Sequence, residues 1–233
     1  ERERALEVLT EALAESYRND GFNALFWYDL GATDDFLAAV TEKLLHRDAN
    51  AWRRIAREQF EQELAPMFRP MRFADVDTAR DAELIALNVA APVALAHAFV
   101  AAATATPRHH LLNVASVVAW QAIPNFATYG ASKVFVRNFS EALHYKLAPR
   151  GIGVTCLCPG GTRTEFHALA GAGDYGRLSR AAMLDADPVA ERGVRAMLAG
   201  KKTVVPGALN RLSCWLTGVL PRGLASRSAA RVL

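Results

Sequence analysis

The stretch from His110 to Cys158 decides the fold of this chain: it contains HLLNVASVV at 110–118, TYGASKVFVRNFSEALHYKL at 128–147 and GIGVTCLC at 151–158. The first and third segments are short, apolar and rich in small and β-branched residues, which is typical of buried strands. The middle segment predicts a helix. A strand, a helix and a second strand in this order indicate a parallel β–α–β unit.

The same alternation continues on both sides of this unit. A long helix, apolar almost all round after Leu84, is predicted from about Thr78 to Ala105. A helix over 188–199 and a short strand over 202–205 follow the unit, whereas 162–185 is ambiguous. We therefore predict an α/β fold built on a parallel sheet.

The N-terminal third of the chain is less regular. Residues 1–18 predict an amphipathic helix, and the aromatic run Asn23–Leu30 predicts a buried strand. A helix is expected over 36–45. The charged segment 46–66 looks helical and solvated, and 67–77 reads as a loop broken by prolines.

Length and composition set limits on the organisation of the protein. The chain has 233 residues, of which 52% are apolar and 22% charged, so a substantial core can be buried. We expect a single domain over 1–233, with 46–66 as an atypical insertion and 206–233 as a basic tail. No apolar run approaches about 20 residues, so no transmembrane helix is expected. The chain begins at Glu1 without a basic-then-apolar leader, so we expect no signal peptide.

Cysteine and histidine usage indicates a reducing compartment and no metal. The three cysteines form no metal-binding pattern, and Cys156 and Cys158 are expected to be buried as small apolar residues. The cytoplasm is the expected location. No ligand spacing relates the six histidines, so no metal site is expected. They are His46, His97, His109, His110, His144 and His167.

The charge distribution is more informative than the net charge of +3, which does not indicate nucleic-acid binding. From Arg192 to the end of the chain there are eight basic residues and no acidic residue. Within 211–231, Trp215 lies among leucines and arginines. This segment could contact a membrane surface, or it could cover a substrate pocket or a partner subunit.

Tyr129 and Lys133 carry the first sign of chemistry. Residues four apart on a helix share one face, so the phenol and the ammonium are expected to point the same way. A free phenol has a pKa of about 10, and lowering it toward 7 takes roughly 4 kcal/mol of preferential stabilisation of the phenolate. A nearby cation acts in this direction, so the pair predicts a general acid/base.

Polar groups at strand ends and a helix break accompany this pair. Ser116 lies at the end of a predicted strand, where α/β proteins place ligand groups. In a helix the carbonyl of Asn88 would accept from residue 92, but Pro92 has no N–H, so a kink and an unpaired carbonyl are expected. After the next strand, PGGTRT at 159–164 offers a Pro-Gly turn and hydroxyl groups to a flat polar ligand.

Together these motifs resemble the short-chain dehydrogenase/reductase family. The matching segments are LNV at 87–89, NVAS at 113–116, YGASK at 129–133 and PG followed by Thr164 at 159–164. The resemblance covers about Phe68 to Leu212 and is fainter over 1–45, where Asn23–Leu30 looks like the family's third strand. It implies a Rossmann-like doubly wound fold, an oxidoreductase that interconverts an alcohol and a carbonyl, and a homodimer or homotetramer formed through the apolar helices within 84–105 and 134–147.

The resemblance also implies a role for each matched residue. Tyr129 is the acid/base, Ser116 bonds the substrate oxygen, Lys133 holds the nicotinamide ribose and lowers the phenol pKa, and Asn88 holds a relay water. The nicotinamide amide is expected at the turn after the second strand. The residues implied for cofactor binding are Asp29 (adenine), Asn88, Tyr129, Lys133, Pro159, Gly160, Thr162 and Thr164.

One part of the family pattern is missing. The glycine-rich T-G-x-x-x-G-x-G turn that receives the cofactor pyrophosphate does not occur in the sequence, so the N-terminal βαβ portion is missing or altered. Two interpretations are open: a fragment of a working enzyme, or an inactive chain that acts as a binding or scaffold protein. The cofactor is NAD or NADP, with Arg2 and Arg4 favouring the 2′-phosphate of NADP. Phe166, Leu169, Tyr175 and Leu178 suggest a moderately apolar substrate.

Overall fold

The computed structural model describes residues 26–29, 73–103, 109–124, 126–163 and 181–220. At its centre, β2 (His109–Val114) and β3 (Ile152–Leu157) pair in parallel over their full length, with His109 opposite Ile152 and Val114 opposite Leu157. The short β6 (Thr203–Val204) pairs in parallel with β3, and β1 (Phe26–Asp29) lies on the other side of β2. The order across the sheet is β1-β2-β3-β6.

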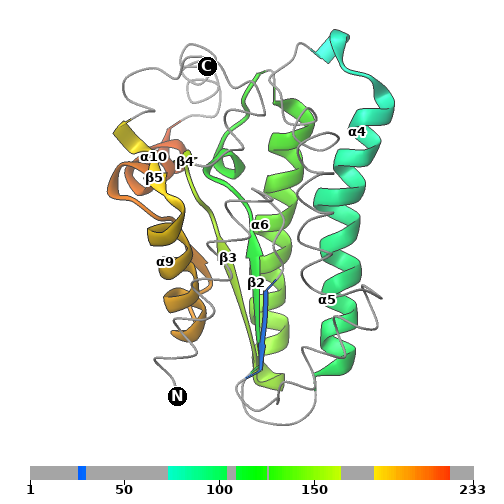
Figure 1. Ribbon diagram of the computed structural model, residues 1–233, viewed down its shortest axis with the longest axis vertical. Coiled ribbons are helices and arrows are strands. Elements are labelled where there is room, and N and C mark those ends of the chain that lie inside the picture. The colour runs from blue at the N-terminus through cyan, green and yellow to red at the C-terminus, as the bar shows by residue number, and fades with distance from the viewer. Residues whose placement is uncertain (1–25, 30–72, 104–108, 125, 164–180, 221–233) are drawn as a thin grey trace.

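Helices cover both faces of this sheet (Figure 1). On one face lie α6 (Ala127–Leu147) and, beside it, α4 (Thr78–Ile85) and α5 (Ala91–Ala102). On the other face lies α9 (Ala186–Leu198). The predicted α/β class and doubly wound arrangement are confirmed, and the element bounds lie close to the predicted ones.

Short elements complete the fold at the carboxyl ends of the strands. The end of the predicted strand 110–118 is a 3₁₀ turn, η5 (Val117–Trp120). The ambiguous stretch contributes β4 (Thr162–Arg163) and β5 (Leu184–Asp185), which pair in parallel. Helix α10 (Ala208–Val219) packs against η5. The remaining short turns are η3 (Phe73–Asp75) and η6 (Ala148–Arg150).

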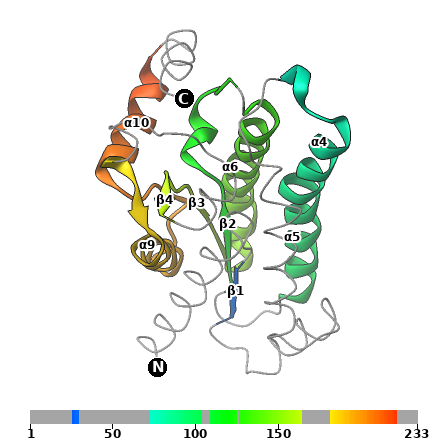
Figure 2. The same ribbon diagram turned by 45° about the horizontal axis from the view of Figure 1, so that its top comes forward.

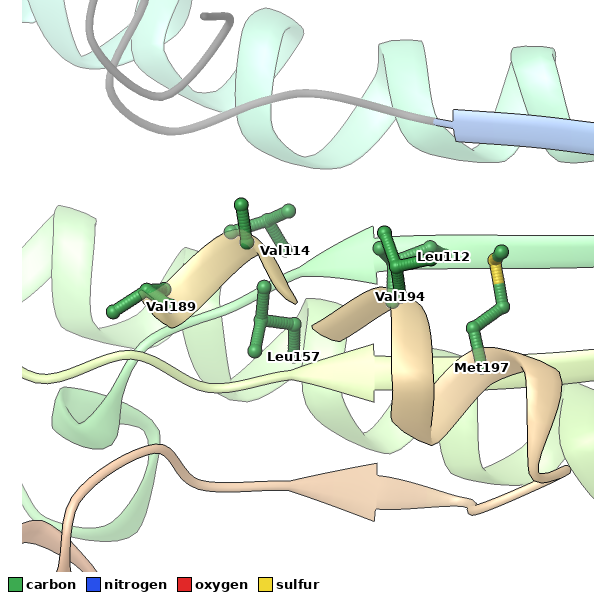
Figure 3. Close-up of a cluster of buried hydrophobic side chains, with 7 residues drawn as sticks. Leu112, Val114, Leu157, Val189, Val194 and Met197 are labelled. Atoms are coloured by element: carbon green, nitrogen blue, oxygen red, sulfur yellow. The ribbon is translucent and has the colours of Figure 1, made fainter. Parts of the chain in front are cut away.

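The core consists of two layers because successive strand residues point to opposite faces. Leu112 and Val114 of β2 and Leu157 of β3 pack against α9, as Figure 3 shows. The intervening residues, such as Leu111 and Val154, pack against α5 and α6. Burial on both faces explains why these strands read as continuous apolar runs.

The helix that precedes β2 is interrupted where the sequence predicts a kink. Residues Ala86–Ala90 form a π-helical turn (η4) between α4 and α5, in which the N–H of Ala91 bonds to the carbonyl of Ala86. Pro92 follows in the first turn of α5. A π turn lets the helix continue past a residue that has no N–H to donate.

The expectation that no segment is long and apolar enough to cross a membrane is wrong for Thr78–Ala101, which reaches a mean hydropathy of 2.0. In the fold this stretch lies beside the sheet and α6, with Leu84, Ala96 and Phe99 buried, but only 29% of its apolar window is buried. Packing on the sheet therefore accounts for part of its apolar character only.

The prediction for Asn23–Leu30 is correct in part. A strand forms at Phe26–Asp29, but it runs antiparallel to β2 and pairs with it directly, so the sheet is not wholly parallel. In a Rossmann sheet the third strand lies at one outer edge, far from the strands of the second half of the fold. Because β1 pairs directly with β2, the prediction that Asn23–Leu30 is the family's third strand is wrong. An apolar aromatic run indicates a buried strand, but it does not specify direction or neighbour.

Predictions for 1–25, 30–72 and 221–233 lie outside the described residues, and so do the whole segment 46–66 and the end of the tail. The single domain over 1–233 stays a prediction.

Candidate active site

The site lies at the carboxyl edge of the sheet, where β2 and β3 end side by side. The strands continue to pair beyond their last residues, because Ala115 N–H donates to the Leu157 carbonyl at 2.8 Å and Val117 N–H to the Pro159 carbonyl at 2.9 Å. The Ser116 hydroxyl lies between these two bonds and donates to the Pro159 carbonyl at 3.5 Å. A bond of this length is weak, so the hydroxyl can readily exchange it for a ligand oxygen.

Tyr129 and Lys133 reach this edge from the first two turns of α6. The Lys133 ammonium nitrogen lies 3.4 Å from the Val114 carbonyl oxygen at the end of β2. The same nitrogen lies 5.7 Å from the centre of the Tyr129 ring. Both side chains are buried, and the Tyr129 ring also contacts Phe126 with 5.9 Å between ring centroids. The structure thus brings the predicted pair together beside the strand that leads to Ser116.

Burial changes the protonation of Lys133. The side chain is fully inaccessible, and desolvation lowers its pKa from 10.5 to about 7, while the neighbouring Cys156 and Cys158 act in the opposite direction. Near neutral pH the amine can therefore hold or release its proton at little cost. The two thiols are buried 3.6 Å apart, and burial raises the pKa of Cys158 well above its ordinary value. The prediction that both cysteines fill the core as small apolar residues is confirmed.

Asn88 is held at the π turn by a residue that the sequence analysis did not select. The Asn88 side-chain amide donates to the Ser132 hydroxyl at 2.9 Å, and Ser132 donates to the Tyr129 carbonyl at 2.7 Å. Ser132 therefore connects Asn88 to the helix that carries Tyr129 and Lys133. The Asn88 Oδ1 atom is buried and has no hydrogen-bond partner among the described residues. A buried acceptor of this kind needs a water or a ligand group.

The turn after β3 has the form expected of a backbone cradle. Pro159 and Gly160 follow the strand, and the Thr162 hydroxyl donates back to the Gly160 carbonyl at 3.1 Å. A second residue missed by the sequence analysis, Asn210 of α10, lies against Gly160: a Cβ atom added there would come within 2.5 Å of the Asn210 carboxamide. The Asn210 amide is fixed by a bond to the Pro206 carbonyl at 3.0 Å.

This close approach gives a testable prediction for stability. We expect Gly160→Ala to lower the free energy of unfolding by about 1–3 kcal/mol, because the new methyl group overlaps a fixed carboxamide. Asn210→Ala in the same chain should recover part of this loss, giving a coupling of about 0.5–3 kcal/mol between the two positions. Denaturant unfolding of the single and double variants measures both quantities.

The control for this prediction is Gly130→Ala on α6, where an added Cβ meets no atom within 4 Å. This variant should be neutral or more stable by up to about 1 kcal/mol, because alanine favours a helix. Equal losses for the two glycine variants, or strict additivity of Gly160→Ala and Asn210→Ala, would contradict the proposed contact.

Some predicted site residues are not brought to this edge. Asp29 lies opposite His109 in the β1–β2 register, at the amino end of β2 and therefore at the other end of the sheet from Ser116. The structure does not support the expected adenine contact of Asp29. Thr164, the two arginines Arg2 and Arg4, and the apolar residues expected near the substrate lie outside the described residues.

The comparisons with known proteins concern the family and the fold. Residues 65–173 match the family model for short chain dehydrogenase. A dehydrogenase/reductase SDR family protein 7-like of Drosophila melanogaster is 32% identical over 130 residues, which cover 54% of this chain and 40% of the relative. An uncharacterized oxidoreductase of Myxococcus xanthus is 33% identical over 85 residues, covering 36% of this chain and 34% of the relative. The matches thus span less than half the length of these relatives.

Solved structures show the same fold. A short-chain dehydrogenase from Sphingobium yanoikuyae in complex with NADPH superposes with a TM-score of 0.52 at 24% identity, covering 66% of this chain and 62% of that one. A short chain dehydrogenase from Burkholderia cenocepacia in complex with NADP gives 0.56 at 20% identity, covering 68% and 63%. At these identities the likeness shows the fold.

Proposed function

Because this chain belongs to the short-chain dehydrogenase/reductase family, we propose that it is an oxidoreductase that interconverts an alcohol and a carbonyl group with a nicotinamide cofactor. One observation carries the proposal: the buried Lys133 amine contacts both the Tyr129 ring and the end of the strand that leads to Ser116. A phenol, an amine and a hydroxyl at one strand edge are the groups that proton exchange with a carbonyl oxygen needs.

Each of these residues has a separate task. The Tyr129 phenol exchanges a proton with the substrate oxygen. The Ser116 hydroxyl leaves its weak bond to Pro159 and donates to that oxygen, which stabilises the charge that develops on it. Lys133, with a pKa of about 7, lies next to the phenol and can replace the proton that Tyr129 gives up. A water on the unpaired Asn88 Oδ1 extends this path away from the substrate.

The described residues fit the nicotinamide end of the cofactor. When bound, the cofactor supplies or accepts the hydride. Lys133 would hold the ribose, and the turn formed by Pro159, Gly160 and Thr162 would hold the amide, with Thr164 next in sequence. Asn210 fills the space where a Cβ of Gly160 would lie, so packing behind the turn already requires a glycine at this position.

The adenine end of the cofactor has no such support in the described residues. Asp29 lies at the wrong end of the sheet, and the sequence has no glycine-rich turn for the pyrophosphate. These two observations keep the second candidate open, an inactive chain that binds a partner as a scaffold. The preference for NADP, based on Arg2 and Arg4, stays a prediction.

Cofactor titration separates the two candidates. The protein, expressed from its complete reading frame, is titrated with NADH and with NADPH while the nicotinamide fluorescence is followed. We expect saturable binding of at least one of them, and tighter binding of NADPH if the arginines contact the 2′-phosphate. No binding of either would overturn the oxidoreductase proposal and leave the scaffold protein.

The cellular location and the oligomeric state of the enzyme are also proposals. We infer a cytoplasmic protein, which the three free, buried cysteines support. We also propose that a second copy packs on the face formed by α4, α5 and α6. The apolar composition of α5 and the exposed Ile85 at the end of α4 support that arrangement.

A further inference from the structure

Helix α10 presents an apolar stripe to solvent. Its buried face carries Asn210 and Cys214, which are one helical turn apart and less than a tenth exposed. The opposite face carries large apolar side chains that are each at least two-fifths exposed. These are Leu209, Leu212, Trp215, Leu216, Val219 and Leu220. A contiguous set of this kind on one helix is characteristic of a surface that binds something apolar.

The position of α10 leaves this stripe accessible. The helix lies at the periphery of the fold, beside β4 and on the far side of the sheet from α5, as the two ribbon views show (Figures 1 and 2). Its inner side is fixed to the fold because Asn210 donates to the Ala182 carbonyl at 3.3 Å and to the Pro206 carbonyl at 3.0 Å, and because the helix packs against η5. The stripe is therefore presented on an anchored helix.

The charge around the stripe identifies the kind of partner. The sequence over 211–231 contains four basic residues and no acidic residue, and one of them, Arg211, is an exposed residue of α10 itself. A symmetric contact with a second copy would bring this basic segment against itself, because a two-fold interface pairs a patch with the same patch. Anionic lipid headgroups complement the charge, each lysine or arginine near such a surface adding attraction that salt weakens.

We propose that α10 docks on an anionic membrane surface, lying in the interface with its apolar stripe in the acyl boundary and Arg211 at the headgroups. Trp215, which is 63% exposed, is the residue best suited to anchor the helix at headgroup depth.

The test is co-sedimentation with vesicles of phosphatidylcholine alone and with vesicles in which part of it is replaced by phosphatidylglycerol. We expect binding to the anionic vesicles only, weakened by added salt. Trp215→Glu should weaken it by roughly tenfold or more, because it removes the anchor and adds a repelled charge. The matched control is Phe73→Glu, since Phe73 is a similarly exposed aromatic in η3, away from α10.

Three results would overturn the proposal. One is no binding to anionic vesicles by the wild-type protein. Another is equal binding of the wild type and Trp215→Glu to the anionic vesicles, or a loss of binding with Phe73→Glu as large as that with Trp215→Glu. The third is a dimer, seen by sedimentation without vesicles, that Trp215→Glu dissociates, because the stripe would then belong to a second copy. The assay needs no cofactor or substrate, so its outcome is independent of the oxidoreductase proposal.

Discussion

Tyr129→Phe is expected to lower the kcat of carbonyl reduction by roughly 10³-fold, the range that a positioned acid/base contributes to a reaction. The substitution removes one oxygen from a side chain that is 8% exposed and keeps the ring in its contacts with Phe126 and Lys133. Cofactor binding should change little, since the ring remains. The measurement is oxidation of NADH or NADPH with the best substrate from a panel of apolar ketones and aldehydes.

Tyr145→Phe is the matched control for this prediction. Tyr145 lies on the same helix but is 66% exposed, and its hydroxyl accepts only a surface bond from Lys202 at 3.3 Å among the interactions that the structure describes. We expect this variant to keep wild-type activity. A Tyr129→Phe enzyme that retains more than a tenth of the wild-type kcat, or an equal loss in both variants, would remove Tyr129 from the chemistry.

Lys133→Met is expected to make the protein more stable near neutral pH. In the folded state burial holds the Lys133 pKa at about 7, against 10.5 in the unfolded chain. Between these values the unfolded chain binds more protons, so the stability of the wild type rises with pH. Taken alone, this ionisation adds about 2 kcal/mol between pH 7 and 9. The methionine variant has no charge to bury, so it should lack this slope and be more stable at pH 7 by up to about 4 kcal/mol.

The pH range in which stability rises ends near pH 9, because the ionisation of buried thiols lowers stability above that pH. Burial raises the pKa of Cys214 to about 11 and that of Cys158 well above its ordinary value, so the unfolded chain loses these protons first and stability falls. Denaturant unfolding at several pH values, with Lys146→Met on the exposed side of α6 as control, measures the difference. A Lys133→Met protein that is less stable than wild type at pH 7 would contradict the prediction. The same variant should lose activity, which separates a functional lysine from a structural one.

The parts of the site that the sequence predicts are those that follow from local pattern and sheet geometry. Two buried strands joined by a helix predict a parallel pair, and parallel strands end at the same edge. This rule brings Ser116 and the Pro159 turn together, as the bond between Val117 N–H and the Pro159 carbonyl shows. Helical periodicity likewise places Tyr129 and Lys133 on one face. Their predicted roles await the experiments above.

The parts that the sequence does not predict depend on contacts between distant residues. The bond from Asn88 to Ser132 joins positions 44 residues apart, and a serine in a helix gives no sign of its partner. Asn210 is similar, because only the packed fold places it against Gly160. Pro92 predicts a missing hydrogen bond, but the form of the break, a π turn over Ala86–Ala90, depends on how the neighbouring turns pack.

The contact between Asn210 and Gly160 couples two distant parts of the molecule. Because the carboxamide fills the space behind the turn, a shift of α10 toward the turn would displace the backbone that follows β3. A ligand of α10 that favours one position of the helix then changes the affinity of the turn for its own ligand by some factor. Thermodynamic reciprocity requires that a ligand bound at the turn change the affinity of α10 for its ligand by the same factor.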